Sequence, residues 1–161
     1  MRVVVLCGPP CAGKTTLVHR LTHPGDWVLD YDDLARALGS PARWIHPEPY
    51  RTMAEQDMQH RIHSAYHQPC DGTAWVIRTC PKPHQRAALA HHWQASVYVL
   101  DPGEQQCRHR ATLDARPRGT LTRIGDWYHA YRPWTGDRDL TELLSTVNGP
   151  REQHSGETTQ R

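Results

Sequence analysis

Short hydrophobic runs, each ended by a turn or by charged residues, recur along the chain at intervals that leave room for a helix between them. Four runs have the length and the β-branched or aromatic content of buried strands. They cover residues 3–6, 27–29, 73–77 and 96–100. The segments between them are longer and more polar, and in residues 50–67 the hydrophobic positions follow a helical spacing. The pattern therefore predicts an α/β protein in which strands and helices alternate.

The same pattern predicts where the helices lie and how the sheet is built. Helices are expected at residues 15–22, 34–38, 50–67, 83–93, 104–115, 122–131 and 140–147. Strands joined through helices run parallel, so the expected fold is a three-layer sandwich with a short parallel sheet of about four or five strands. Ligands of such sheets bind at the carboxyl ends of the strands. Gly8, Asp30, Arg78 and Asp101 lie at or just after the ends of predicted strands, and we expect them to meet at this edge.

The length of 161 residues suits one domain with a core of its own. We expect this domain to cover residues 1–147, followed at 148–161 by a polar, disordered tail. No hydrophobic run is long enough for a signal peptide or a membrane span. The five cysteines form no CxxC pair and are odd in number, which favours reduced thiols in a cytoplasmic protein.

The net charge of +2 is modest and does not by itself indicate a nucleic-acid partner. The kind of charge is more distinctive, with seventeen arginines and two lysines. Arginine suits bidentate contacts with phosphate, although compositional drift explains the same count equally well.

One stretch indicates a specific chemistry. Residues 8–15, GPPCAGKT, match the phosphate-loop pattern GxxxxGK[ST] and lie between a predicted strand and a predicted helix. The glycines let backbone N–H groups approach a polyphosphate, Lys14 brings a charge to its β- and γ-phosphates, and Thr15 is placed to bind Mg²⁺. The residues expected to contact the nucleotide are Gly8, Pro9, Pro10, Cys11, Ala12, Gly13, Lys14, Thr15 and Thr16. The chain is therefore predicted to bind a nucleoside triphosphate together with Mg²⁺.

Three carboxylates, Asp30, Asp32 and Asp33, follow the second predicted strand. In phosphoryl transfer, a carboxylate accepts the proton of the attacking hydroxyl group. The alternative is that Asp32 or Asp33 caps the helix predicted to begin at Leu34. With three acids available, one can cap the helix while another acts in catalysis.

Together, the loop, the acidic strand end and an arginine-rich segment late in the chain resemble the small P-loop kinases, especially the kinase domain of polynucleotide 5′-hydroxyl kinases. More distantly, the chain resembles shikimate kinase and the chloramphenicol phosphotransferases. The resemblance covers about residues 1–133, and only the phosphate loop is specific on its own. It implies an ATP-dependent kinase in which lid arginines close over the triphosphate.

The resemblance implies two registers for the catalytic base. In polynucleotide kinases the base is followed three residues later by an arginine that engages substrate, which selects Asp33 and Arg36 here. Counting from the strand end selects Asp32 instead, and this register also fits the DxD motif of shikimate kinases with Asp30 and Asp32. Asp32 is favoured, because distance from the strand end fixes where a side chain points, and Asp33 is the alternative.

The resemblance also implies a lid at about residues 108–120 that brings Arg110 and Arg116 onto the transferring phosphoryl group. The simpler alternative for each arginine is a solvated basic helix face.

The third predicted strand departs from the family pattern. Many P-loop enzymes end this strand with an aspartate that holds Mg²⁺ through water, and this chain has Arg78 there. Either Asp30 takes over that role beside Thr15, or metal binding rests on Thr15 and the nucleotide alone. Arg78 is a candidate for binding an anionic acceptor.

The predicted function is transfer of the γ-phosphate of ATP to a hydroxyl acceptor, with a polynucleotide or nucleotide 5′-hydroxyl favoured. Arginines interleaved with aromatic residues, which suit a nucleic-acid end, recur over residues 36–61 where the acceptor would bind. The alternatives are a small-molecule kinase acting on an antibiotic or metabolite, and a P-loop ATPase or nucleotide-binding protein without an acceptor. The modest net charge favours the small-molecule alternative slightly.

Overall fold

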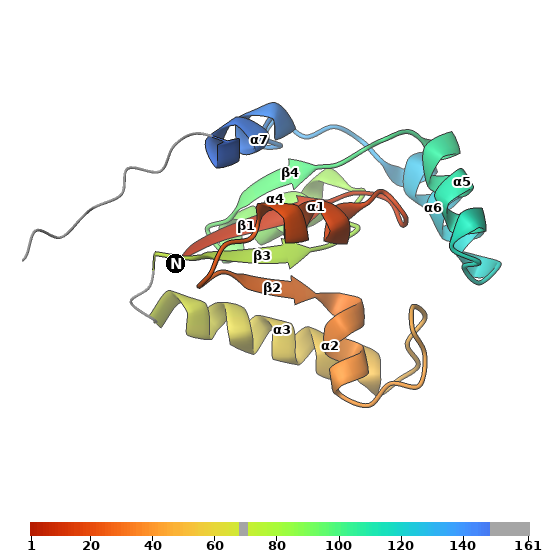
Figure 1. The fold of residues 1–161 in the computed structure, drawn as a ribbon, viewed down its shortest axis with the longest axis horizontal. Coiled ribbons are helices and arrows are strands. Elements are labelled where there is room, and N and C mark those ends of the chain that lie inside the picture. Colours follow the sequence, from red (N-terminus) through yellow and green to blue (C-terminus); the bar gives the residue numbers. More distant parts are fainter. Residues whose placement is uncertain (68–70, 149–161) are drawn as a thin grey trace, which may run out of the picture.

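The computed structural model describes residues 1–67 and 71–148. Its elements follow one another in the order β1 (Arg2–Cys7), α1 (Lys14–Leu21), β2 (Trp27–Asp30), α2 (Tyr31–Ala37), α3 (Tyr50–His67), β3 (Thr73–Ile77), α4 (Pro83–His92), β4 (Ser96–Val99), α5 (Glu104–Leu113), α6 (Gly119–Ala130) and α7 (Leu140–Asn148). Within these residues the strands form a four-stranded parallel sheet with the order β2-β3-β1-β4 (Figure 1). The predicted parallel α/β sheet is therefore confirmed.

The central position of β1 determines where the phosphate loop lies. β1 pairs with β3 on one side and with β4 on the other, so Val5 lies opposite both Val76 and Val97. A strand covered on both faces needs a nearly continuous hydrophobic run, and residues 3–7 supply it. The segment that leaves β1 therefore starts from the middle of the sheet, at the edge where the parallel strands end.

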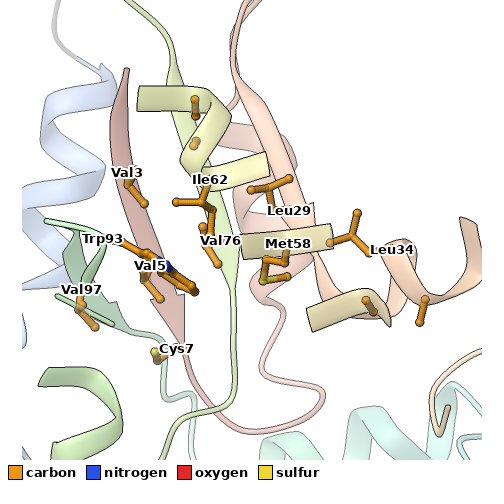
Figure 2. Packing of buried hydrophobic residues seen from close by; sticks show 14 residues of the cluster. Val3, Val5, Cys7, Leu29, Leu34, Met58, Ile62, Val76, Trp93 and Val97 are labelled. Atoms are coloured by element: carbon orange, nitrogen blue, oxygen red, sulfur yellow. The ribbon is translucent and has the colours of Figure 1, made fainter. Parts of the chain in front are cut away.

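Side chains that alternate along β1 contribute to two separate cores. Val3 and Val5 belong to the face that α2, α3 and α4 cover, where they share a buried cluster with Met58, Ile62 and Trp93 (Figure 2). Full burial of a side chain such as Met58 or Ile62 contributes about 1.5–3 kcal/mol to folding. This cluster fixes α3 against the sheet, and it thereby places the segment that connects α2 to α3.

The opposite face of the sheet is covered by α1 and α7. Val4 and Leu6 of β1 share a buried cluster there with Val18 of α1 and Leu143 of α7. The sheet is thus the middle of three layers, as the sequence predicts.

The helices α5 and α6 lie beyond the carboxyl ends of the strands (Figure 1). They pack on each other through Cys107, Ala111 and Ile124, and this small core also includes Ala12 of the phosphate loop. The lid expected at residues 108–120 corresponds to the end of α5, the connection to α6 and the start of α6. We refer to α5, α6 and the connection between them as the lid helices.

Two helices begin three residues earlier than predicted. α2 starts at Tyr31, because the side chain of Asp30 accepts the backbone N–H of Asp32 at 3.0 Å and caps the helix. The alternative in which Asp32 or Asp33 caps this helix is therefore wrong. α6 starts at Gly119, because its N-cap residue Arg118 already has helical backbone angles and the backbone N–H of Thr120 donates to the carbonyl oxygen of Pro117 at 2.8 Å.

A buried arginine holds the segment before α7 against α4. Arg86 of α4 is fully buried and forms a bidentate ion pair with Asp137, with N–O distances of 2.7 and 2.9 Å. Its remaining N–H groups donate to the carbonyl oxygens of Cys80, Pro81 and Arg132. The guanidinium charge is fully paired, which compensates for its removal from water.

None of the helices in the described part of the chain is both long and apolar enough to cross a membrane. The 18 residues of α3 include several charged side chains, among them Arg61 and Asp57, which form an exposed ion pair. The tail predicted at 148–161 lies, from residue 149 onwards, outside the described residues.

Candidate active site

The phosphate loop connects β1 to α1, and the two glycines of its pattern occupy positions that disfavour a side chain. Gly8 has φ +151°, and a Cβ there would lie 2.3 Å from the carbonyl oxygen of Leu100, just after β4. Gly13 has φ +94° and immediately precedes the first residue of α1. Glycine adopts this backbone region without strain. The loop therefore packs closely against the sheet and leads directly into a helix N-terminus, which attracts anions.

Lys14 is folded onto the phosphate loop. Its Nζ donates hydrogen bonds to the carbonyl oxygens of Gly8 at 3.0 Å and Pro9 at 2.8 Å. Burial lowers the pKa of Lys14 to about 8, and the Asp30 carboxylate acts in the opposite direction. A cation removed from water gains strongly from a nearby anion, so Lys14 is poised to bind a phosphate group.

Thr15 and Asp30 bring two oxygen groups together beside the loop. The Thr15 hydroxyl donates a hydrogen bond to Asp30 Oδ2 at 2.7 Å. A hydroxyl and a carboxylate are ligands that Mg²⁺ accepts, and Mg²⁺ usually keeps several waters and binds phosphate oxygens as well. Thr15 and Asp30 are therefore the residues that would hold a Mg²⁺ ion here, together with phosphate oxygens and water.

Asp32 lies on the cleft side of α2 and contacts a buried histidine. Its Oδ1 is 3.2 Å from Nε2 of His46, whose Nδ1 is 2.8 Å from the Ser40 hydroxyl. The His46 side chain is 1% exposed, whereas that of Asp32 is 43% exposed. Burial and the nearby Asp30 raise the pKa of Asp32, while His46 and Arg123 lower it. Asp32 is therefore a carboxylate that is exposed to the cleft and held in its orientation by the buried His46.

Asp33, the neighbour of Asp32, is placed differently. It pairs with Arg36 one turn further along α2. Both side chains are about half exposed, and neither lines the cleft described below. The two alternative bases therefore lie on different sides of the helix.

Arg78, at the end of β3, already has a carboxylate partner. It donates two hydrogen bonds to Glu55 of α3, at 2.8 and 2.6 Å. These bonds hold the pKa of Glu55 below its usual range. Both residues border the cleft, but the charge of Arg78 is largely neutralised by Glu55.

Two arginines of the lid helices approach the site. Arg110 Nη1 donates a hydrogen bond to the carbonyl oxygen of Ala12 in the phosphate loop at 2.6 Å. Arg116 lies 4.3 Å above the ring of Trp44 and 3.5 Å from the carboxylate of Asp114. Arg110 therefore rests on the phosphate loop, whereas Arg116 connects the lid to residues 42–49, which we call the 42–49 loop.

A cleft of about 1080 Å³ joins these groups. It is bordered by the phosphate loop, the ends of β2 and β3, the 42–49 loop and the lid helices. The predicted site residues that line it are Pro10, Cys11, Ala12, Gly13, Lys14, Thr15, Thr16, Asp30, Asp32, Arg78, Arg110 and Arg116. Gly8 and Pro9 contact Lys14 instead, and Asp33 and Arg36 lie apart. The volume is sufficient for a nucleotide with a small second substrate.

Several residues of the cleft were not singled out from the sequence, among them His46, Glu55 and Arg123. His46 belongs to an irregular loop, and its contact with Asp32 depends on how that loop folds back onto α2. Glu55 and Arg123 lie on helices whose exposed charges carry no motif. No local sequence signal marks any of the three.

A phosphate loop at the carboxyl edge of a parallel sheet, with an acidic strand end and helices above it, defines a small P-loop kinase fold. A family model described as an AAA domain matches residues 3–121, and the chain belongs to this family. Among curated proteins, none matches this sequence at a significant level.

Solved structures show the same fold. The tunicamycin resistance protein of Deinococcus radiodurans is 16% identical with a TM-score of 0.56, over 91% of this chain and 92% of that one. A shikimate kinase from Acinetobacter baumannii, in complex with shikimate, is 16% identical with a TM-score of 0.54, over 91% of this chain and 94% of the other. The resemblance to small P-loop kinases that the sequence suggested is thereby confirmed at the level of fold.

Proposed function

We propose that this protein is a phosphotransferase that moves the γ-phosphate of ATP to the hydroxyl group of an acceptor, with Mg²⁺ as cofactor. One observation carries the proposal: Asp32 opens into the same cleft as Lys14 of the phosphate loop. Phosphoryl transfer needs positioned phosphates and a carboxylate near the attacking hydroxyl group, and this cleft offers both.

The chemistry follows from this arrangement. The acceptor oxygen forms a bond to the γ-phosphorus while the bond from that phosphorus to the β,γ-bridging oxygen breaks. The acceptor proton passes to Asp32, and ADP is the leaving group. Lys14 and the loop amides hold the β- and γ-phosphates, and a Mg²⁺ ion bound by Thr15, with Asp30 behind it, would neutralise phosphate charge.

The lid arginines complete the proposed site. Arg110 rests on the phosphate loop at Ala12 and borders the cleft. Arg116 lines the same cleft. We assign to both arginines the stabilisation of the negative charge that develops on the transferring phosphoryl group. Asp33 has no such role in the proposal, because it pairs with Arg36 outside the cleft.

For the acceptor we favour a small alcohol over a polynucleotide end. Arg36, Arg51 and Arg61 lie in the region where the sequence suggested nucleic-acid contacts, and each is paired with a carboxylate of this chain. Arg78, the candidate for binding an anionic acceptor, is paired with Glu55 as well. A polynucleotide is bound chiefly through unneutralised basic groups. The pairing therefore supports a compact substrate. A small alcohol is now preferred to a polynucleotide end, whereas the sequence favoured the polynucleotide end.

A 5′-hydroxyl nucleotide end is the second candidate. Trp44 borders the cleft, with the guanidinium of Arg43 4.8 Å from its ring centre and that of Arg116 4.3 Å away. An aromatic ring flanked by arginines suits the stacking of a base.

The test is transfer of ³²P from γ-labelled ATP, with Mg²⁺, to acceptors offered one at a time. They comprise a panel of small alcohols, a nucleoside and a 5′-hydroxyl oligonucleotide. A labelled acceptor that is lost with Lys14→Ala supports the proposal and identifies the acceptor class. Free phosphate from every mixture, with no labelled acceptor, would contradict it and indicate an ATPase.

The adjacent aspartates provide a matched pair of variants. Asp32→Asn is expected to bind ATP normally and to lose about 10²–10⁴-fold in transfer rate, since the proton acceptor is gone. Asp33→Asn is expected to stay close to the unmodified protein. The reverse result would show that the base has been assigned to the wrong residue.

A further inference from the structure

His46 connects three positions of the fold around the cleft. Asp32 lies in the first turn of α2, Ser40 lies just beyond the end of α2, and His46 lies in the 42–49 loop. Nε2 of His46 is 3.2 Å from Asp32 Oδ1, and Nδ1 is 2.8 Å from the Ser40 hydroxyl. The imidazole is 1% exposed, so both ring nitrogens are directed to protein groups.

These partners define the direction of each hydrogen bond. An ionised carboxylate only accepts hydrogen bonds, so Nε2 of His46 must be protonated and must donate the hydrogen bond to Asp32. In the neutral ring, Nδ1 is then the acceptor, and the Ser40 hydroxyl is its donor. Ser40 is itself held in place, because its backbone N–H donates to the carbonyl oxygen of Ala35 at 3.0 Å. The chain of bonds therefore runs from Ser40 through His46 to Asp32.

The arrangement leaves one oxygen of Asp32 available. Oδ1 is engaged by His46, and no residue in the described part of the chain hydrogen-bonds to Oδ2. A carboxylate held through one oxygen cannot rotate freely, so the direction of the other oxygen is fixed as well. That direction matters because proton transfer requires a heavy-atom distance of about 2.6–3.2 Å.

We infer that His46 is a positioning residue for Asp32: it donates a hydrogen bond from Nε2 to Oδ1 and thereby directs Oδ2 towards the acceptor hydroxyl group. This inference rests on the proposed role of Asp32 as the base. His46 does not itself touch the reacting atoms. It also contacts Tyr31 edge to face, with ring centroids 6.0 Å apart, so its effect on the fold has to be separated from its effect on Asp32.

To separate the effect on Asp32 from the effect on the fold, the test compares two amide side chains of similar polarity at position 46. His46→Gln places an amide N–H close to the position of Nε2, whereas His46→Asn reaches only as far as Nδ1. We expect His46→Asn and His46→Ala to lower kcat about 10- to 100-fold, as removal of an outer-shell partner does, with the KM for ATP unchanged. His46→Gln is expected to recover most of the rate, and His60→Ala, on an exposed position of α3, serves as the control.

The rate is measured as ADP formation from Mg-ATP, with the acceptor that becomes labelled in the transfer assay, or with water if none does. Equal rates for the Asn and Gln variants would overturn the inference even if the Ala variant fails to fold. Asp32→Asn is measured in parallel. If it loses activity while His46→Asn does not, the inference alone fails; if Asp32→Asn keeps full activity, the proposed base fails.

A second readout needs no substrate. Long-range ¹H–¹⁵N spectra of the histidine-labelled full chain report which ring nitrogen carries the proton. We expect Nε2 of His46 to carry a proton, and we expect Asp32→Ala to change its Nε2 resonance while Asp33→Ala does not. An Nε2 without a proton would overturn the inference.

Discussion

The hydroxyl of Thr15 donates a hydrogen bond to Oδ2 of Asp30 at 2.7 Å and joins the first turn of α1 to the end of β2. The other oxygen of the same carboxylate accepts the backbone N–H of Asp32 and caps α2. Asp30 therefore fixes the relative position of the two groups that the proposed reaction needs, the Mg²⁺-binding hydroxyl and the base. A substitution of Asp30 would disturb both at once, so Thr15 is the better probe of metal binding.

Replacement of Thr15 is expected to change the Mg²⁺ dependence of nucleotide binding. Thr15→Ala removes the hydroxyl and should raise the Mg²⁺ concentration needed for half-maximal ATP binding about 10- to 100-fold. Thr15→Ser keeps the hydroxyl and should stay near the unmodified protein. Calorimetric titrations with ATP at several Mg²⁺ concentrations measure this. Identical Mg²⁺ dependence in all three proteins would remove Thr15 from the metal site.

Replacement of Arg110 is expected to slow transfer far more than it weakens ATP binding. The guanidinium supplies charge to the transferring group, so Arg110→Ala should lower kcat about 10³-fold or more. Arg108 offers the control on the same helix, because it pairs with Glu104 and does not line the cleft. Transfer rates and ATP affinities of Arg110→Ala and Arg108→Ala are compared. A similar, small loss in both would mean that α5 presents only a solvated basic face.

Cys80 is expected to react with alkylating reagents at unusually low pH. A hydrogen bond shared with Cys7, together with the charges of Arg78 and Arg86, lowers the pKa of Cys80 to about 7. The same hydrogen bond and burial raise the pKa of Cys7. Because the thiolate is the reactive form, the rate with iodoacetamide should rise through pH 7 and level off about one unit above it.

The readout is the pH profile of alkylation at Cys80, followed by mass spectrometry of the modified peptides. Cys80→Ser should remove the component with its midpoint near pH 7. Arg78→Met should move the midpoint upwards, because a cation that favours the thiolate is lost. A midpoint near the ordinary thiol value of 9.0 would contradict the arrangement around Cys80.

Loss of Arg86 is expected to destabilise the whole fold. Arg86→Leu leaves the Asp137 carboxylate without its partner at a site where the arginine is fully buried. Breaking such a pair from one side removes about 3–5 kcal/mol from the free energy of unfolding. Denaturation by guanidinium chloride measures the change.

An exposed ion pair provides the comparison. Arg61 and Asp57 are one helical turn apart on α3, with an N–O distance of 2.9 Å. Arg61→Ala should change the free energy of unfolding by less than about 1 kcal/mol. Equal losses for Arg86→Leu and Arg61→Ala would show that burial does not strengthen the Arg86 pair.

The sheet and the phosphate loop could be predicted because their signals are local. The run at residues 3–7 specifies a strand buried on both faces, and the glycines, lysine and threonine that follow it specify the loop. The pairing of Asp33 with Arg36 is also local, since residues three apart on a helix are neighbours.

The choice between Asp32 and Asp33 was harder, because it depends on where α2 begins. Successive residues on a helix point about 100° apart, so one position decides whether a carboxylate enters the cleft. The cap formed by Asp30 sets that start, and the sequence placed it three residues too late.

The partners of Arg78 and Asp32 could not be predicted. Glu55 lies 23 positions before Arg78, on α3, which packs against one face of the sheet. The contact between the two side chains exists only in the folded chain. His46 reaches Asp32 from an irregular loop. Such long-range polar contacts have no periodicity in the sequence. From the sequence, Arg78 is a candidate for binding an anion, whereas in the structure Glu55 largely neutralises its charge.

The ring of Trp44 has a consequence for how the two substrates influence each other. It belongs to the 42–49 loop, which borders the proposed acceptor side, and it holds Arg116 of the lid helices against its face. Coupling between two binding sites is reciprocal. If a bound triphosphate draws Arg116 away from Trp44 and thereby changes the affinity for the acceptor, the acceptor changes the affinity for ATP by the same factor.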